Sequence, residues 1–221
     1  MSLCVYVVQK ANQHGLRYLQ GPFLLALISN MKFLIAGLGN VGNEYAHTRH
    51  NIGFDTVNAF VVKHNGSFRT DRLAHVADVK WKGKIFVCIC PTTYMNLSGK
   101  AVKYWMDKEK IALENILVIV DELALPLNKL RLKPGGSDAG HNGLKSLHES
   151  LGTVQYPRLR FGIGNDFPKG MQSEFVLGKW RKEDESLVKL KIDAAVETIE
   201  IFATQGITAA MNWINNKTFS L

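Results

Sequence analysis

A single histidine in a polar segment is the residue of this 221-residue sequence best suited to chemistry. His50 lies in residues 45–51, after an apolar run at residues 32–36 and a glycine-rich turn at residues 37–42. Histidine titrates near neutral pH, so its ring can take up a proton and return it. Open α/β sheets place their ligand sites in loops at the carboxyl ends of strands. We therefore interpret His50 as a general base.

A carboxylate that could orient this histidine follows a second apolar run. Asp121 ends the run of residues 116–120, and a buried carboxylate needs a partner. If Asp121 accepts one ring N–H of His50, the other ring nitrogen is free to take a proton from water. Capping of a turn is the simpler role for an isolated Asp121, and Glu122 could replace it beside His50. The pattern thus predicts a histidine–carboxylate pair that activates water.

Two further polar positions lie at predicted helix starts. Residues 140–143 place His141 and Asn142 after a glycine loop, where free backbone N–H groups favour anions. The spacing resembles a Walker loop, but the lysine and the following hydroxyl residue are absent, so we do not predict nucleoside triphosphate binding. Asn96 holds a similar position before another helix. Helix capping is the alternative role for these side chains.

The glycines of residues 37–42 fit the G-x-G-x-x-G pattern of dinucleotide sites. That mechanism needs a helix that opens at the glycines, whereas nine residues, 43–51, come first here. We therefore predict no nucleotide cofactor and interpret the glycines as a tight turn that holds Asn40 at the strand tip. The sequence contains no G-x-S-x-G or H-E-x-x-H motif, and we predict no metal site. A hydrolase that activates water directly fits best.

Positive charge points to a polyanionic partner. The formal net charge is +8, which favours nucleic acid over a membrane, with solubility alone as the alternative. Arg131 and Lys133 share one face of a predicted strand, and Arg158 and Arg160 share one face of another, with Lys145 in the helix between the two strands. We interpret these five side chains as phosphate contacts, which supply affinity without reading bases.

Strand and helix patterns alternate along the chain and predict an α/β fold: a single three-layer domain with a twisted mixed sheet flanked by helices. Strands are predicted at residues 32–36, 74–81, 84–90, 115–120, 129–133 and 158–163, and helices at 51–64, 96–110, 141–151, 183–204 and 207–216. Asn51 is the expected N-cap of the first helix, and Lys82-Gly83 the expected hairpin turn. Cys88 and Cys90 should both face the core, which suits a reducing compartment.

The first 30 residues differ from the rest of the chain. They contain no Asp or Glu, and no run in the sequence reaches the ~18 apolar residues that a membrane helix needs. We interpret residues 1–30 as a loosely ordered extension or added leader, with a transit peptide as the less favoured alternative. The catalytic domain is then expected to span residues 31–221.

Five ordered motifs carry a family resemblance from residue 31 to about residue 216. They lie at residues 37–40, 48–53, 93–99, 121–123 and 140–145. With these motifs the chain resembles bacterial-type peptidyl-tRNA hydrolases, which cleave the ester between a peptide and the 3′ ribose of tRNA. The resemblance implies a monomeric cytoplasmic enzyme that needs no cofactor and has peptidyl-tRNA as its partner.

The resemblance also implies roles for individual residues. It implies His50 as the base and Asp121 as its orienting partner. Its implied substrate-binding residues are the amides Asn40, Asn96 and Asn142 and the cleft-lining residues Tyr45, Met95 and His141. Its implied clamp on the tRNA 5′ phosphate is Lys133 with Arg160. One departure is Val120, where some relatives carry histidine before the aspartate. Two other functions stay open: a dinucleotide-dependent oxidoreductase and a non-catalytic RNA-binding protein.

Overall fold

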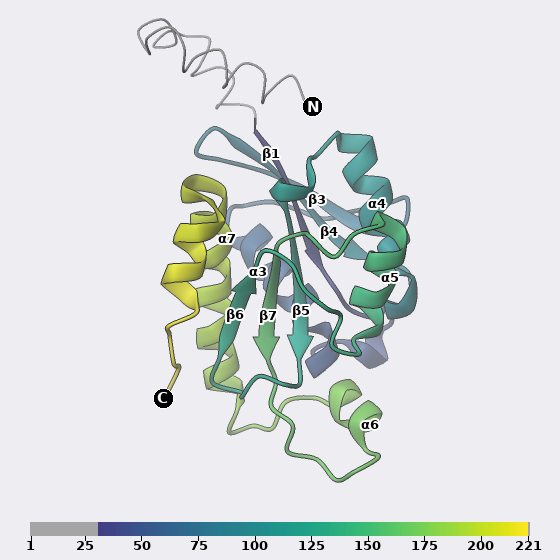
Figure 1. Cartoon of the computed structure of the whole chain (residues 1–221), viewed down its shortest axis with the longest axis vertical. Helices are drawn as coiled ribbons and strands as arrows, with labels where there is room; N and C mark the ends of the chain where they lie inside the picture. Colours follow the sequence, from purple (N-terminus) through teal and green to yellow (C-terminus); the bar gives the residue numbers. More distant parts are fainter. Residues whose placement is uncertain (1–30, 221) are drawn as a thin grey trace, which may run out of the picture.

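A seven-stranded mixed sheet forms the centre of the protein in a computed structural model that describes residues 31–220 (Figure 1). The strands are β1 (Lys32–Gly37), β2 (Arg69–Asp71), β3 (Ala74–Trp81), β4 (Lys84–Pro91), β5 (Ile116–Glu122), β6 (Leu130–Lys133) and β7 (Arg158–Gly162). They lie in the order β2-β3-β4-β1-β5-β7-β6. Strands β4, β1, β5 and β7 are parallel, and antiparallel strands complete both edges. The predicted extension at residues 1–30 lies outside the described residues.

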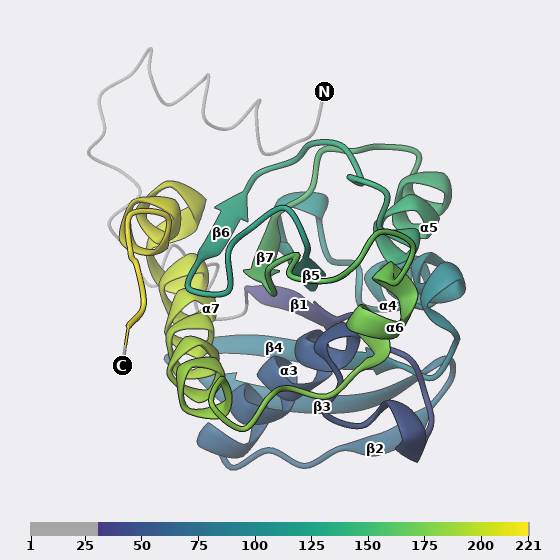
Figure 2. The same cartoon turned by 90° about the horizontal axis from the view of Figure 1, so that it is seen from below.

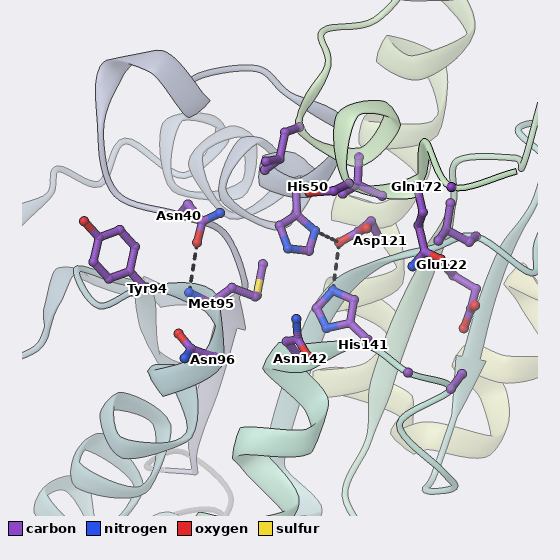
Figure 3. Close-up of a pocket in the computed structure, with 17 residues that line it drawn as sticks. Asn40, His50, Tyr94, Met95, Asn96, Asp121, Glu122, His141, Asn142 and Gln172 are labelled. Atoms are coloured by element: carbon purple, nitrogen blue, oxygen red, sulfur yellow. Dashed lines mark hydrogen bonds and ion pairs between the residues drawn. The ribbon is translucent and has the colours of Figure 1, made fainter. Parts of the chain in front are cut away.

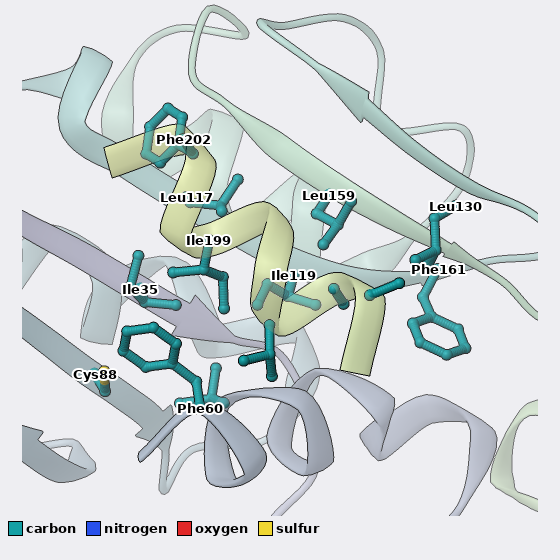
Figure 4. Packing of buried hydrophobic residues seen from close by; sticks show 14 of the residues in the cluster. Ile35, Phe60, Cys88, Leu117, Ile119, Leu130, Leu159, Phe161, Ile199 and Phe202 are labelled. Atoms are coloured by element: carbon teal, nitrogen blue, oxygen red, sulfur yellow. The ribbon is translucent and has the colours of Figure 1, made fainter. Parts of the chain in front are cut away.

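Helices cover both faces of this sheet, which confirms the predicted three-layer α/β fold. Helices α3 (Ile52–Lys63) and α7 (Glu185–Ile214) pack on one face, and α4 (Ser98–Glu109) and α5 (Asn142–Leu151) on the other (Figure 2). Alternate residues of β1 and β5 therefore enter two separate cores; Ile35 and Ile119, for example, meet Phe60 of α3 and Ile199 of α7 (Figure 4). The short helix α6 (Gln172–Leu177) lies beyond the carboxyl ends of β5 and β7 (Figure 1).

Most local predictions agree with the structure, with a few corrections. The hairpin turn is confirmed: Lys82 and Gly83 have φ values of 45° and 70° between β3 and β4. The break expected between the predicted helices 183–204 and 207–216 is also found: Gly206 has φ 84° and ψ 173° inside α7. Strand β2 and helix α6 were not predicted, because both are short and lack periodic apolar residues. The helix predicted from residue 96 starts with a 3₁₀ turn, η3 (Met95–Leu97), before α4 begins.

Glycines of the first motifs permit close backbone contacts in this fold. A Cβ on Gly37 would lie 2.3 Å from the Gly53 carbonyl oxygen, and one on Gly53 would lie 2.5 Å from the Leu38 nitrogen. Helix α3 therefore presses its first turn against the end of β1. It starts only after two 3₁₀ turns, η1 (Asn43–Tyr45) and η2 (Arg49–Asn51), and not at the glycines. This geometry places His50 directly over the carboxyl edge of the sheet.

A similar contact joins the two helices on the other face. A Cβ on Gly99 would lie 2.1 Å from the Ser146 carbonyl oxygen, so α4 and α5 approach closely at this point. Their first turns consequently reach the same edge of the sheet as His50. Among the described residues, no helix has both the length and the apolar character needed to cross a bilayer. Cys88 and Cys90 are buried and unpaired, as predicted.

One buried lysine joins helix α7 to the sheet. The side chain of Lys191 is fully buried, and its ammonium group donates hydrogen bonds to the carbonyl oxygens of Leu127 and, at 2.6 Å, Gly162. The same nitrogen lies 3.9 Å from the ring centroid of Phe161. Burial disfavours the charged form and lowers the pKa of Lys191 to about 7.

This lysine should make the stability of the fold depend on pH. The folded chain releases the Lys191 proton near pH 7, whereas an unfolded lysine keeps it up to a pKa of 10.5. The unfolded state therefore binds more protons between these values, so the free energy of unfolding should rise with pH across this window. We expect Lys191→Met to reduce that rise, measured by urea unfolding at about pH 7 and about pH 10. Equal pH dependence in the two proteins would contradict a depressed pKa.

Candidate active site

A cleft of about 740 Å³ opens at the carboxyl edge of the parallel strands (Figure 3). Its walls come from segments that are far apart in the sequence. It is lined by the loop after β1, the turn η2, the loop and turn after β4, the end of β5, the start of α5, and α6. The lining residues from these segments include Asn40, His50, Tyr94, Met95, Asn96, Asp121, His141, Asn142 and Gln172. Most of the predicted site residues thus share one cleft.

A carboxylate flanked by two imidazoles lies at the centre of this cleft. Asp121 Oδ1 is 2.9 Å from His50 Nδ1 and 2.9 Å from His141 Nε2 (Figure 3). All three side chains are largely buried, with 13%, 3% and 11% of the His50, Asp121 and His141 side chains exposed. The structure thus contains the predicted contact between His50 and Asp121, and it adds a second imidazole to the same oxygen.

The hydrogen bonds of His141 fix its tautomer. His141 caps helix α5: its Nδ1 accepts the backbone N–H groups of Gly143 at 3.1 Å and Leu144 at 3.3 Å. Its hydrogen must therefore lie on Nε2, which donates to Asp121. His50 donates to the same carboxylate through Nδ1, so its Nε2 keeps a lone pair free for a ligand in the cleft. The sequence predicted His141 as a cleft residue, but not this contact.

These contacts keep the central carboxylate ionised. Burial alone raises the pKa of Asp121, but attraction to His141 and His50 and their two hydrogen bonds outweigh burial. Together they hold the pKa of Asp121 well below its usual range. Glu122, the alternative partner of His50, instead accepts a hydrogen bond from Arg160 at 2.5 Å. Of these two carboxylates, Asp121 is the one that contacts His50.

The same three side chains have the composition of a metal site. One ligand atom from each of His50, Asp121 and His141 lies within 4.8 Å of the others. Metal binding through His141 Nε2 would, however, require loss of the hydrogen that the Nδ1 contacts place there. The donor geometry therefore favours a hydrogen-bonded cluster over a metal centre.

Three side-chain amides surround this triad. Asn40 Oδ1 accepts the Met95 backbone N–H at 2.9 Å, which leaves Asn40 Nδ2 as a donor on the side of His50 (Figure 3). Asn96 and Asn142 are exposed at the mouth of the cleft, whereas Met95 is buried beneath it. The donor of Asn40 is thus oriented before any ligand binds.

Tyr45, which the resemblance placed in the cleft, lies outside it. Tyr45 belongs to η1, and it is not among the residues that line the cleft. Tyr45 is the last residue of η1, whereas His50 lies in the next turn, η2. Tyr94 instead supplies the aromatic ring, 62% exposed at the cleft mouth. Tyr94 was not predicted as a site residue, although it directly precedes Met95 within a recognised motif.

Helix α6 is the second missed part of the wall. Arg49 holds it in place: Arg49 Nη1 donates to the carbonyl oxygens of Phe175 at 3.2 Å and Lys179 at 2.9 Å. The guanidinium carbon also lies 4.3 Å from the Phe175 ring centroid. Gln172 and Val176 of α6 line the cleft. A six-residue helix gives too little periodicity to be recognised in a sequence.

The predicted basic residues are close together but differ in exposure. On antiparallel β6 and β7, Arg131 lies opposite Arg160 and Lys133 opposite Arg158, so all four share one face of the sheet. Arg131 and, on α5, Lys145 are exposed, while Lys133 is half-buried. These three side chains suit contact with an external phosphate.

The predicted phosphate contacts of the two arginines of β7, Arg158 and Arg160, need correction. Arg158 is fully buried and donates to the carbonyl oxygens of Ser137 at 3.1 Å and Val154 at 2.7 Å. Arg160 is 8% exposed; besides its pair with Glu122, it donates to the Ser137 carbonyl oxygen at 2.7 Å. Their guanidinium groups therefore fasten the loop that leads to His141 and are not free for a phosphate. Strand alternation showed that they share a face, but not that this loop covers it.

Comparison with known proteins agrees with the motifs and the fold. The family model for peptidyl-tRNA hydrolase matches residues 34–220. Peptidyl-tRNA hydrolase of Parabacteroides distasonis is 52% identical over 187 residues, which cover 85% of this chain and 100% of the relative. The relative from Porphyromonas gingivalis is 50% identical over 185 residues, covering 84% of this chain and all of its own length.

Solved structures agree as well. The crystal structure of peptidyl-tRNA hydrolase from Acinetobacter baumannii has a TM-score of 0.80 and 36% identity to this chain. The match covers 84% of this chain and 95% of that structure. With a matching family model, relatives at half identity and a shared fold, this chain belongs to the peptidyl-tRNA hydrolase family.

Proposed function

We propose that this protein hydrolyses the ester bond between a peptide and the 3′ ribose of tRNA by activating water with His50. Family membership supports the substrate and the reaction. The observation that carries the mechanism is the His50 Nδ1 contact with Asp121 at 2.9 Å, which leaves His50 Nε2 available to the cleft. Action as a monomer in the cytoplasm stays a prediction.

The reaction can be followed atom by atom. His50 Nε2 takes a proton from water, and the water oxygen attacks the ester carbonyl carbon. The negative charge that develops on the carbonyl oxygen is stabilised by the oriented Nδ2 donor of Asn40. The bond to the ribose oxygen then breaks, and His50 Nε2–H returns the proton to that oxygen. We assign Asn96 and Asn142, which line the cleft, to hydrogen bonds with the peptide amides.

The charges of the cleft favour substrates whose amino group is blocked. Of the two carboxylates that line it, Asp121 is held by two imidazoles. Glu122 is held by Arg160 and by the backbone N–H of Ala124 at 3.1 Å. A free α-ammonium group would meet no unpaired carboxylate among the described lining residues. We therefore expect peptidyl or N-acetyl-aminoacyl esters to be cleaved in preference to plain aminoacyl-tRNA.

The direct test is to incubate the protein with N-acetyl-aminoacyl-tRNA and measure release of the N-acetyl amino acid. The same tRNA with an unblocked amino acid serves as the matched substrate and should react more slowly. Binding of tRNA without release would favour the non-catalytic RNA-binding alternative. Protection of the fold by NAD or NADP, together with an absence of ester cleavage, would favour the oxidoreductase.

The exposed basic residues should contribute salt-dependent affinity. We propose that Lys133, with Arg131 and Lys145, contacts tRNA phosphates. Lys133→Ala should weaken tRNA binding and reduce the slope of log affinity against log salt by about 1, the effect of about one lost phosphate contact. Titrations at several salt concentrations measure this slope.

Two variants make this prediction specific. Lys189→Ala removes an exposed lysine on α7, on the opposite face of the sheet, and should leave the slope unchanged. Arg160→Gln should lower the melting temperature, because Glu122 loses its buried partner, but should change the slope little. A larger slope change for Arg160→Gln than for Lys133→Ala would restore Arg160 to the phosphate clamp.

A further inference from the structure

The residue after the proposed base has an unexpected set of contacts. Asn51 is 3% exposed and occupies the N-cap position of helix α3, as the sequence predicted. Its side chain, however, makes no capping hydrogen bond. It contacts the backbone of Asn40 instead, 11 positions earlier in the chain.

The contact is a two-point clamp on the backbone of Asn40. Asn51 Oδ1 accepts the Asn40 N–H at 2.8 Å, and Asn51 Nδ2 donates to the Asn40 carbonyl oxygen at 2.9 Å. A side-chain amide offers one donor group and one acceptor, which matches these two backbone groups. If the Asn51 amide were turned by 180°, its Nδ2 would face the Asn40 N–H and its Oδ1 would face the Asn40 carbonyl oxygen, and neither hydrogen bond could form. The clamp therefore fixes both the position of Asn40 and the orientation of Asn51.

A third hydrogen bond extends this effect to the Asn40 side chain. With its backbone held by Asn51, Asn40 places Oδ1 against the Met95 N–H at 2.9 Å. The remaining group of that amide, Nδ2, lines the cleft beside His50 (Figure 3). Three hydrogen bonds thus fix the proposed oxyanion donor from both ends.

The motif glycine next to Asn40 leaves room for this clamp. A Cβ on Gly39 would lie 3.0 Å from Asn51 Oδ1 and 2.8 Å from Phe54 Cδ1. The contact with Phe54 is shorter than a Cβ atom tolerates and the contact with Asn51 is tighter than most, so a side chain at residue 39 would require the Phe54 ring and the Asn51 amide to shift. The glycine at residue 39 therefore has a packing explanation that requires no nucleotide.

We propose that Asn51 is a positioning residue that sets the direction of the Asn40 amide relative to His50. Asn51 and His50 are neighbours in the turn η2, so one short segment carries both the base and the clamp on the oxyanion donor. Preorganised donors stabilise a transition state because they need no reorientation during the reaction. This inference rests on the proposed function.

A double-mutant cycle tests this role with N-acetyl-aminoacyl-tRNA as the substrate. Loss of one oxyanion donor typically lowers kcat about 10²–10³-fold, so Asn40→Ala should fall in this range. Asn51→Ala should lower kcat at least about 10-fold, with less change in KM. In the Asn40→Ala background, Asn51→Ala should add little, because the donor it positions is already gone. The pH profile of kcat/KM should keep its shape.

Two further variants separate positioning from loss of folding. Asn51→Asp keeps the volume and the acceptor for the Asn40 N–H, but it sets a second oxygen against the Asn40 carbonyl, so kcat should fall although the variant is folded. Thr56→Val removes a hydrogen bond to the Ile52 carbonyl oxygen within α3, away from the cleft, and should lower the melting temperature without lowering kcat.

The outcomes are distinct. Additive losses in the cycle, or an Asn51→Asp enzyme with wild-type kcat, would overturn the positioning role of Asn51. A wild-type protein that cleaves no ester at all would instead overturn the proposed function.

Discussion

Replacing His50 by alanine is expected to lower turnover of N-acetyl-aminoacyl-tRNA by about 10²–10⁴-fold, the usual effect of losing a general base. Among the described residues that line the cleft, only the His50 ring has both a free nitrogen lone pair and a hydrogen bond to a carboxylate. The other imidazole, His141, has its Nδ1 lone pair occupied by backbone N–H groups. Binding of tRNA should survive, because the proposed phosphate contacts lie on β6 and α5. Single-turnover kinetics and a binding titration measure the two effects.

His47, three residues before His50, provides a matched control. His47 is 79% exposed at its side chain and contacts Asp55 at 3.0 Å, so it repeats a histidine–aspartate pair outside the cleft. His47→Ala should retain wild-type turnover. If His50→Ala also retained it, His50 would have no part in the chemistry, and the water would need another base.

The position of His50 and Asp121 could be predicted because it follows from a general property of α/β sheets. Polar residues at the carboxyl ends of adjacent parallel strands meet at one edge, whatever the details of packing. Strands β1 and β5 are neighbours, so the loop after β1 and the last residues of β5 come together. The motif glycines Gly37 and Gly53 then bring η2 onto that edge.

Other features depend on what covers a residue, which a local pattern does not contain. Arg158 and Arg160 alternate on a strand as solvent-facing cations would, yet the loop through Ser137 lies over them. Asn51 occupies a capping position, and only the tertiary contact with Asn40 shows that its amide is used elsewhere. The partners of these side chains could not be predicted, because each had more than one possible partner.

Replacing Asp121 by asparagine should separate the charge of the carboxylate from its geometry. Both imidazoles contact the same atom, Asp121 Oδ1, at 2.9 Å. An amide oxygen at that position can accept both hydrogen bonds, so the two rings can keep their orientation while the negative charge is lost. The imidazolium that His50 becomes during the reaction then lacks its counter-charge. We expect turnover to fall about 10²–10⁴-fold.

Comparison with Asp121→Ala decides which property of the carboxylate matters. The alanine variant removes the charge and also frees both rings, so it should be at least as slow and should loosen the start of α5, which His141 caps. If orientation alone were required, Asp121→Asn would keep more than about a tenth of wild-type turnover while Asp121→Ala would not. Equal, large losses in two folded variants would instead show that His50 needs the negative charge to carry its proton between water and the ribose oxygen.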